Sequence, residues 1–152
     1  MKKSNFFAFI SRMKYINRWG LMHSAKEENV SEHSLDVAVI AHALTIIQKK
    51  RLNKDIDSYK TVLYAIYHDA AEILTGDMPT PVKYFNPAIK TAYKEVETSA
   101  NKSLLKLLPK DFYEDYEPVL IPRKEDEEIW RTIKAADKIS AYIKCIEEET
   151  SG

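Results

Sequence analysis

Ionisable side chains interrupt apolar helical stretches at three places in the chain. His68 and Asp69 lie inside an apolar run over residues 62–74, and His33 and Asp137 each lie in line with an apolar helical stripe elsewhere. A buried carboxylate is costly unless it is paired or coordinates a cation. Two imidazoles and two carboxylates form a mixed nitrogen and oxygen donor set that suits a divalent transition ion. Together these residues predict a metal centre.

Each of these residues has an ordinary structural interpretation when it is taken alone. His33 could be a hydrogen-bonded core histidine, and Asp137 could be the buried partner of a lysine or arginine. His42 follows His33 by nine residues and faces the opposite side of the same helix, so we interpret it as structural, and His23 lies in a loop and receives no role. Their joint occurrence on three core helices favours the metal centre.

Two further positions have side chains suited to phosphate chemistry. Glu72 follows His68 by four residues, which would place both on one helical face and bring a carboxylate near the metal without making it a ligand. Such a group can transfer a proton, although a solvated glutamate at a helix end shows the same spacing. Arg18 offers a forked donor for a phosphate, and Trp19 a flat wall for a sugar or base.

The segments that must position these residues are predicted to be helical. Three glycines in 152 residues are too few and too far apart for a phosphate-binding glycine loop or a dinucleotide fingerprint. Apolar residues recur at helical spacing in five segments without proline or internal glycine. These segments are residues 5–15, 31–50, 58–74, 87–109 and 126 onward, so the sequence predicts an all-α single domain.

Local signals refine this prediction. Ser4, Ser31 and Asn86 are candidate N-caps, and Gly76 is a candidate left-handed C-cap. The prolines at 79 and 81 predict an extended loop over residues 77–81, and residues 109–123 are expected to form only one irregular helical turn. The second helix, residues 31–50, has an apolar stripe in line with His33 and a second apolar stripe made of Leu35, Val39 and Ile46. It is therefore predicted to be central and buried on most sides.

Overall composition excludes several kinds of partner and site. The 23 basic and 23 acidic side chains balance, which removes the basic excess expected of a nucleic-acid or membrane-surface protein. Cys145 is the single cysteine, so no internal disulfide can form. We expect no leader sequence, because no charged-then-apolar stretch with a small-residue cleavage site is seen, and uninterrupted apolar runs are far shorter than the roughly 20 residues that span a bilayer. We therefore expect a soluble cytoplasmic protein.

Four segments carry a resemblance to a known family. Residues 17–19 (Asn-Arg-Trp), 28–34 (Glu-Asn-Val-Ser-Glu-His-Ser), 67–84 (Tyr-His-Asp-Ala-Ala-Glu-Ile-Leu-Thr-Gly-Asp-Met-Pro-Thr-Pro-Val-Lys-Tyr) and 134–137 (Lys-Ala-Ala-Asp) are the segments concerned. In order and spacing they resemble the bacterial 5′-deoxynucleotidases of the HD-domain phosphohydrolase superfamily. The resemblance covers nearly the whole chain, and residues 68–84 are specific to this subfamily rather than to HD domains at large.

The resemblance implies an all-α HD-domain helical bundle over residues 1–152, with the family's C-terminal helical part missing. It implies one divalent metal ion, cobalt or manganese first and copper or zinc as alternatives, held by His33, His68, Asp69 and Asp137. The implied reaction is hydrolysis of deoxyribonucleoside 5′-monophosphates to deoxynucleoside and phosphate, with selection against ribonucleotides. The implied partner is this small molecule and neither a nucleic acid polymer nor a membrane, and a homodimer is also implied.

The resemblance further assigns roles by position. Arg18 would orient the phosphate, and Glu72 would be the proton-transfer residue. Trp19 would exclude a 2′-hydroxyl, and Asp77 would accept a hydrogen bond from the 3′-hydroxyl. The residues implied to touch the substrate are Arg18, Trp19, Asp69, Asp77, Met78, Pro79, Thr80 and Asp137.

Two alternative functions remain open. Another HD phosphohydrolase could act on a triphosphate or a cyclic nucleotide, but a two-metal enzyme should show extra ligands, and only His23 and His42 remain. A catalytically silent nucleotide-binding helical module could keep the pocket for sensing. The presence of Glu72 beside all four candidate ligands argues against that module.

Overall fold

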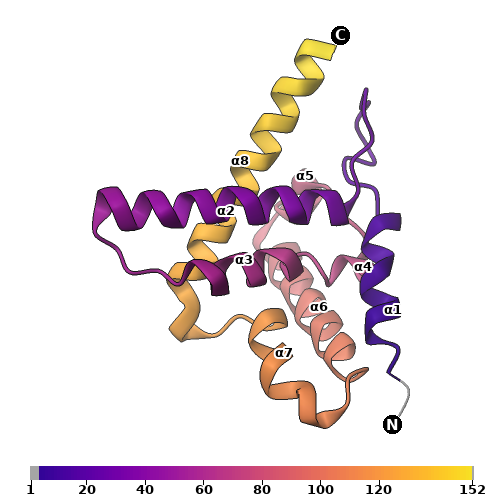
Figure 1. Ribbon diagram of the computed structural model, residues 1–152. Helices are drawn as coiled ribbons and strands as arrows, with labels where there is room; N and C mark the ends of the chain where they lie inside the picture. The colour runs from indigo at the N-terminus through magenta and orange to yellow at the C-terminus, as the bar shows by residue number, and fades with distance from the viewer. Residues whose placement is uncertain (1–3, 152) are drawn as a thin grey trace. The chain divides into compact units, whose positions relative to one another are not determined.

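The structure, a computed structural model, describes residues 4–151 (Figure 1). Within those residues every regular element is a helix, and extended backbone pairs only at the isolated antiparallel bridge between Asn17 and Asn29. The helical elements are α1 (Phe6–Ile10), the 3₁₀ helix η1 (Ser11–Tyr15), α2 (Val30–Leu52), α3 (Ser58–Tyr67), α4 (Glu72–Thr75), α5 (Thr80–Lys83), α6 (Pro87–Leu105), η2 (Lys110–Phe112), α7 (Tyr113–Leu120), η3 (Lys124–Asp126) and α8 (Glu127–Ser151).

The described chain divides into two compact units, each built from two separate stretches of sequence. Unit 1 contains residues 4–30 and 69–121, and unit 2 contains residues 31–68 and 122–151. The chain passes from unit 2 to unit 1 at the peptide bond between His68 and Asp69. The two residues that the sequence singles out as a pair are therefore the last of one stretch and the first of another.

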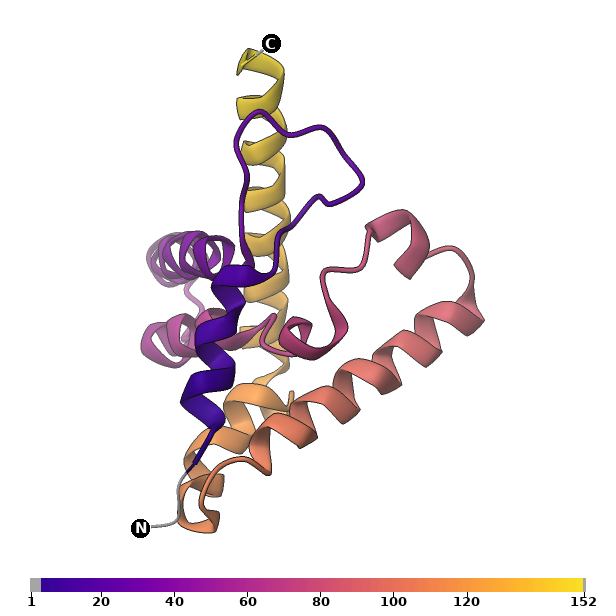
Figure 2. The same ribbon diagram turned by 90° about the vertical axis from the view of Figure 1, so that its right-hand side faces the viewer.

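Unit 1 is organised around the N-terminal helical segment and the long helix α6. Met13, Val30 and Ile73 are buried together, with Phe9, Ile10 and Ile16 packed against them, as the helical spacing of the first segment predicts. Asn86 caps α6 by accepting a hydrogen bond from the Ile89 backbone N–H at 2.8 Å, and Pro87 occupies its first position. Figure 2 shows α6 as a straight helix with the short α5 near its N-terminal end.

Unit 2 contains the helices α2, α3 and α8. Apart from α6, which belongs to unit 1, these are the longest helices of the described chain. α3 packs on α8. Just before α8, the buried carboxylate of Asp126 in η3 accepts hydrogen bonds from two α3 side chains, Lys60 Nζ at 2.6 Å and the Tyr64 hydroxyl at 2.9 Å. Both oxygens of this buried carboxylate are therefore hydrogen-bonded, so its charge is not left unpaired.

Several predicted element boundaries are wrong. The predicted helix over residues 58–74 is interrupted at 68–71, which separates α3 from α4. The extended loop ends at Pro79, because α5 begins at Thr80. Residues 109–123 form η2 and the two-turn helix α7, more than the single turn predicted. The N-cap of α1 is Asn5, although the Ser4 hydroxyl accepts from the Phe6 backbone N–H at 3.3 Å.

The second helix also differs from its prediction. α2 begins at Val30, one residue before the predicted cap Ser31. Val37 and Ala41 are buried, but the second apolar stripe of Leu35, Val39 and Ile46 is exposed, so the helix is buried on one side only. The expectation of a helix buried on most sides is wrong because apolar composition does not distinguish a buried stripe from an exposed one.

By length and composition α2 could also cross a membrane, with a mean hydropathy of 1.3 over its most apolar window. The short uninterrupted apolar runs in the sequence did not predict a possible membrane span, because the most apolar window of α2 also includes polar residues. The core helix of a protein outside the membrane meets the same criterion, and α2 buries His33 and Ser34 in its first turns.

Candidate active site

The first turns of α2 place one imidazole deep in unit 2. His33 is fully buried, and both of its ring nitrogens have partners on α8. Nε2 lies 3.1 Å from Oδ1 of Asp137, and Nδ1 lies 3.3 Å from the Ser140 hydroxyl. Residues 33, 137 and 140 meet because they lie on the apolar stripes of α2 and α8. Asp137 thus lies beside His33, and the side chain of His33 is hydrogen-bonded through both ring nitrogens.

The second imidazole comes from the residue that ends α3. Nδ1 of His68 lies 2.7 Å from the backbone carbonyl of Ala65, and a carbonyl can only accept, so Nδ1 carries the hydrogen. In the neutral ring Nε2 then carries the lone pair, which is the form that binds a metal. The two imidazole rings have their centroids 5.4 Å apart.

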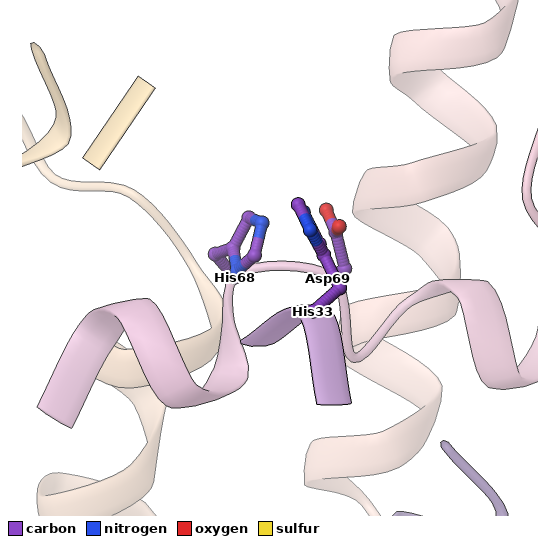
Figure 3. A group of neighbouring side chains, drawn as sticks. All are labelled: His33, His68 and Asp69. Atoms are coloured by element: carbon purple, nitrogen blue, oxygen red, sulfur yellow. The ribbon is translucent and has the colours of Figure 1, made fainter. Parts of the chain in front are cut away.

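Asp69, the next residue in the chain, completes a group that could hold a metal ion. One ligand atom from each of His33, His68 and Asp69 lies within 4.8 Å of the others. Figure 3 shows the three side chains projecting to the same side of the ribbon. Three of the four predicted ligands therefore converge, and Asp137 contacts the first of them through its hydrogen bond to His33.

The interruption after α3 changes how Glu72 is placed. At the interruption the Ala65 carbonyl accepts from the His68 backbone N–H at 3.4 Å and also lies 2.7 Å from Nδ1 of the His68 ring. The next turns are tighter, with the Glu72 N–H donating to the Asp69 carbonyl at 3.0 Å. The prediction that His68 and Glu72 share one helical face assumed a continuous helix, and the helix is interrupted at residues 68–71.

Glu72 is nevertheless held in an unusual electrostatic environment within unit 1. Its side chain is buried, and Oε2 has no hydrogen-bond partner among the described residues. Burial first, and then the negative charges of Asp69 and Asp77, raise the pKa of Glu72 to about 9, against the opposing effect of Arg18 and Lys83. At neutral pH the metal-free protein therefore keeps this carboxyl protonated.

Arg18 and Trp19 lie in the loop that precedes α2, and both are anchored by acidic residues of unit 1. Nη1 of Arg18 donates to Oδ2 of Asp69 at 3.5 Å, and Nε lies 3.6 Å from Oε2 of Glu28. The Trp19 indole N–H donates to the same Glu28 oxygen at 3.0 Å. Trp19 also has a φ of 62°, a left-handed conformation that costs a non-glycine residue about 1–2 kcal/mol.

The loop after α4 reaches the same region. Gly76 has φ 71° and ψ 167°, so the predicted positive φ is confirmed, but the extended ψ is not that of a left-handed cap. Asp77 accepts a hydrogen bond from the Trp19 backbone N–H at 3.2 Å. Met78 and Pro79 are half-buried and Thr80 is exposed. The structure thus brings Arg18, Trp19, Asp69 and Asp77 together within unit 1.

Three residues that received no role in the sequence analysis interact with the candidate site residues. Glu28 binds Trp19, Ser140 binds His33, and Lys83 pairs with Glu97 at 2.6 Å while its charge acts on Glu72. Glu28 and Lys83 lie within the segments that carry the family resemblance, and Ser140 is the polar member of the α8 stripe. These positions in the sequence were the signals that could have identified the three residues.

Comparison with known proteins extends these observations. A family model described as 5′-deoxynucleotidase YfbR-like matches residues 5–152. A 5′-deoxynucleotidase of Vibrio vulnificus is 49% identical over 152 residues, which are 100% of this chain and 78% of that protein. A 5′-deoxynucleotidase of Vibrio parahaemolyticus is 50% identical with the same coverage of both chains.

Solved structures show the same architecture. An HD-domain phosphohydrolase from Listeria innocua matches with a TM-score of 0.84 and 25% identity, over 95% of this chain and 68% of that one. The cyanophage S-2L HD phosphohydrolase DatZ, bound to dA and one catalytic Zn²⁺ ion, matches with a TM-score of 0.61 and 23% identity, over 88% of this chain and 66% of that one. The expected all-α HD-domain fold is confirmed.

Proposed function

The chain belongs to the YfbR-like 5′-deoxynucleotidase family, and from this premise we propose that it hydrolyses deoxyribonucleoside 5′-monophosphates to deoxynucleoside and phosphate and rejects ribonucleotides. The reaction class, a phosphoric monoester hydrolysis, follows from relatives that are 49% and 50% identical over the whole chain. The observation that carries the proposal is the convergence of His33, His68 and Asp69 within 4.8 Å of one another.

These residues fit a divalent metal ion. The donor set mixes imidazole nitrogen and carboxylate oxygen, which is suited to manganese, cobalt, copper or zinc. The hydrogen bond from His68 Nδ1 to a backbone carbonyl selects the tautomer that a metal ligand needs. We assign His33, His68, Asp69 and Asp137 as the ligands and favour cobalt or manganese. The ion would withdraw charge from the phosphoryl group.

The residues of unit 1 bind and orient the nucleotide in this proposal. Arg18 presents its guanidinium to the phosphate, and its contact with Asp69 supports a position close to the ligand set. Trp19 forms the wall that leaves no room for a 2′-hydroxyl. Asp77 binds the 3′-hydroxyl from the rigid loop that continues through Met78, Pro79 and Thr80, and the carboxylates of Asp69 and Asp137 also face the substrate.

Glu72 moves the proton that hydrolysis requires. Its buried carboxyl, with Oε2 unpartnered among the described residues, is available to a water molecule or to the leaving 5′-oxygen. In this proposal Glu72 holds a proton and delivers it to that oxygen. Base recognition is absent from this scheme because the assigned contacts stop at the sugar.

The test is phosphate release from matched deoxyribo and ribo 5′-monophosphates after removal of metal ions and return of cobalt or manganese. We expect release from the deoxyribonucleotides only, and only with metal. A triphosphate and a cyclic nucleotide belong in the same panel, because hydrolysis of these alone would indicate a different HD phosphohydrolase. No release from any member would indicate a silent nucleotide-binding module.

The cellular setting is also part of the proposal. A small-molecule substrate and a balanced charge of 23 basic and 23 acidic residues suit a cytoplasmic enzyme that binds neither nucleic acid polymer nor membrane. We propose a homodimer, supported by exposed apolar side chains such as Leu35 and Val39 on α2. Light scattering after size-exclusion chromatography measures the oligomeric state directly.

A further inference from the structure

The carboxylate of Glu28 contacts both of the residues that we place at the phosphate and the sugar. Its Oε2 accepts from the Trp19 indole N–H at 3.0 Å and lies 3.6 Å from Arg18 Nε. The side chains of Arg18 and Glu28 are only 11% and 12% exposed. At such low exposure the ion pair and the hydrogen bond are weakly screened by solvent, so both restrict how the two neighbours can move.

The backbone fixes Glu28 opposite Arg18. The Arg18 N–H donates to the Glu28 carbonyl at 2.9 Å, next to the antiparallel bridge between Asn17 and Asn29. The Val30 N–H donates to the Ile16 carbonyl at 2.9 Å. These contacts close the loop at its base and set its register, so the side chain at position 28 projects beside those at 18 and 19.

Trp19 requires this support because of its backbone. A tryptophan at φ 62° persists only where its surroundings hold it. Asp77 holds the backbone N–H, and Glu28 holds the ring. The indole has one N–H donor, so the Glu28 carboxylate is the acceptor that sets the orientation of the ring.

We propose that Glu28 is a positioning residue that sets both the discrimination against ribonucleotides, through the Trp19 ring, and the placement of the phosphate, through the Arg18 guanidinium. This inference rests on the proposed function. A wall rejects a 2′-hydroxyl only while it cannot retreat, so loss of the indole hydrogen bond weakens discrimination. Loss of the negative charge beside Arg18 instead affects every phosphate substrate alike.

The two effects can be separated by two substitutions. Glu28→Gln keeps an oxygen that accepts from the indole N–H but removes the charge that pairs with Arg18. Glu28→Ala removes both the oxygen that accepts from the indole N–H and the charge that pairs with Arg18. Glu27→Gln is the matched control, because Glu27 is the exposed neighbour of the same residue type.

The experiment measures kcat and KM for dAMP and AMP with each variant. For Glu28→Gln we expect kcat/KM to fall about tenfold on both substrates, with the dAMP to AMP ratio within about threefold of the original. For Glu28→Ala we expect that ratio to fall by at least about tenfold as well. Glu27→Gln should match the unsubstituted enzyme. An unchanged ratio in Glu28→Ala, whether or not activity falls, overturns the assignment.

A spectroscopic measurement tests the same contact without activity. The chain has two tryptophans, so Trp130→Phe leaves Trp19 as the single indole reporter. In that background Glu28→Ala should shift the Trp19 emission, Glu28→Gln should shift it less, and identical emission from all three contradicts the contact. If the unsubstituted enzyme releases no phosphate from dAMP, the proposed function fails, and the emission still reports whether Glu28 holds Trp19.

Discussion

Glu72 lies four residues after His68, a spacing that suggested a role for this single residue, but the helix on which that prediction depended is interrupted. The residue is still buried among Asp69, Asp77 and Arg18, whose charges all act on it. The sequence predicted a carboxylate near the ligands only from that spacing. The turn at 68–71, where the Ala65 carbonyl accepts from the His68 N–H and lies 2.7 Å from His68 Nδ1, leaves no signal in the helical spacing of the sequence.

Substitution of Glu72 should separate proton transfer from metal binding. We expect Glu72→Ala to lower kcat by about 100-fold or more while the bound metal per chain stays near its original value. Steady-state kinetics and elemental analysis of the same sample measure the two quantities. Loss of metal in parallel with activity would instead make Glu72 a ligand or a structural residue.

The stability of the metal-free protein should depend on pH through the same carboxyl. The pKa of Glu72 is about 9 in the folded protein and 4.5 ordinarily, so between those values the folded state binds a proton that the unfolded state has lost. Stability should therefore fall as pH rises through this window, by up to about 1.4 kcal/mol per pH unit. Denaturation by urea between about pH 5 and pH 8, with chelator present, measures the slope.

Glu72→Gln should flatten that slope because the amide does not titrate. Glu95→Gln, at an exposed glutamate of α6, is the control and should leave the slope unchanged. A slope that persists in Glu72→Gln would mean that other groups cause it.

Among the helices, the N-caps of the long helices and the helical spacing of their apolar residues were predictable, whereas the short helices were not. Asn86 and Pro87 determine the start of α6, and Ile129, Ile133 and Ala136 are buried on α8. The short helices α5 and α7 depend on tertiary contacts, because a helix of this length is not stable alone. Lys83, at the end of α5, pairs with Glu97 on α6 and lies 4.7 Å from the centre of the Tyr93 ring.

The Lys83 to Glu97 pair should hold α5, and with it the loop before it, against α6. We expect Lys83→Met to destabilise the protein by about 1 kcal/mol and to raise KM more than it lowers kcat, because the loop at 77–80 becomes less ordered. The double substitution Lys83→Glu with Glu97→Lys should recover part of both losses. Urea denaturation and steady-state kinetics measure them, and equal effects of the single and double variants would contradict the pairing.

At the scale of the whole molecule, the sequence predicted the fold class and the family, while the division of the described chain into two units was not foreseen. Composition, glycine scarcity and helical spacing suffice for an all-α fold. The assembly of each unit from two distant stretches depends on contacts such as that between His33 and Asp137, which no local pattern encodes. The grouping of His33, His68 and Asp69 was predictable because ionisable residues on apolar faces are rare without a partner.

Metal binding should stabilise the whole protein. An ion that binds only the folded state adds about 2.7 kcal/mol at one hundred times its dissociation constant. We expect the Tm to rise with added manganese or cobalt and to fall with chelator. His33→Ala should abolish this dependence, whereas His42→Ala, at the exposed histidine of the same helix, should retain it. A metal-dependent Tm that survives His33→Ala would place the ion elsewhere.

The contacts of His33 with α8 also bear on the order of events during synthesis. Asp137 and Ser140 are 104 and 107 residues downstream of His33. A ribosome adds about 5–20 residues per second, so the imidazole emerges several seconds before its partners are translated. During that interval α2 and α3 have left the exit tunnel without α8. Metal loading should therefore follow translation, and a nascent chain arrested before residue 137 should not retain the ion.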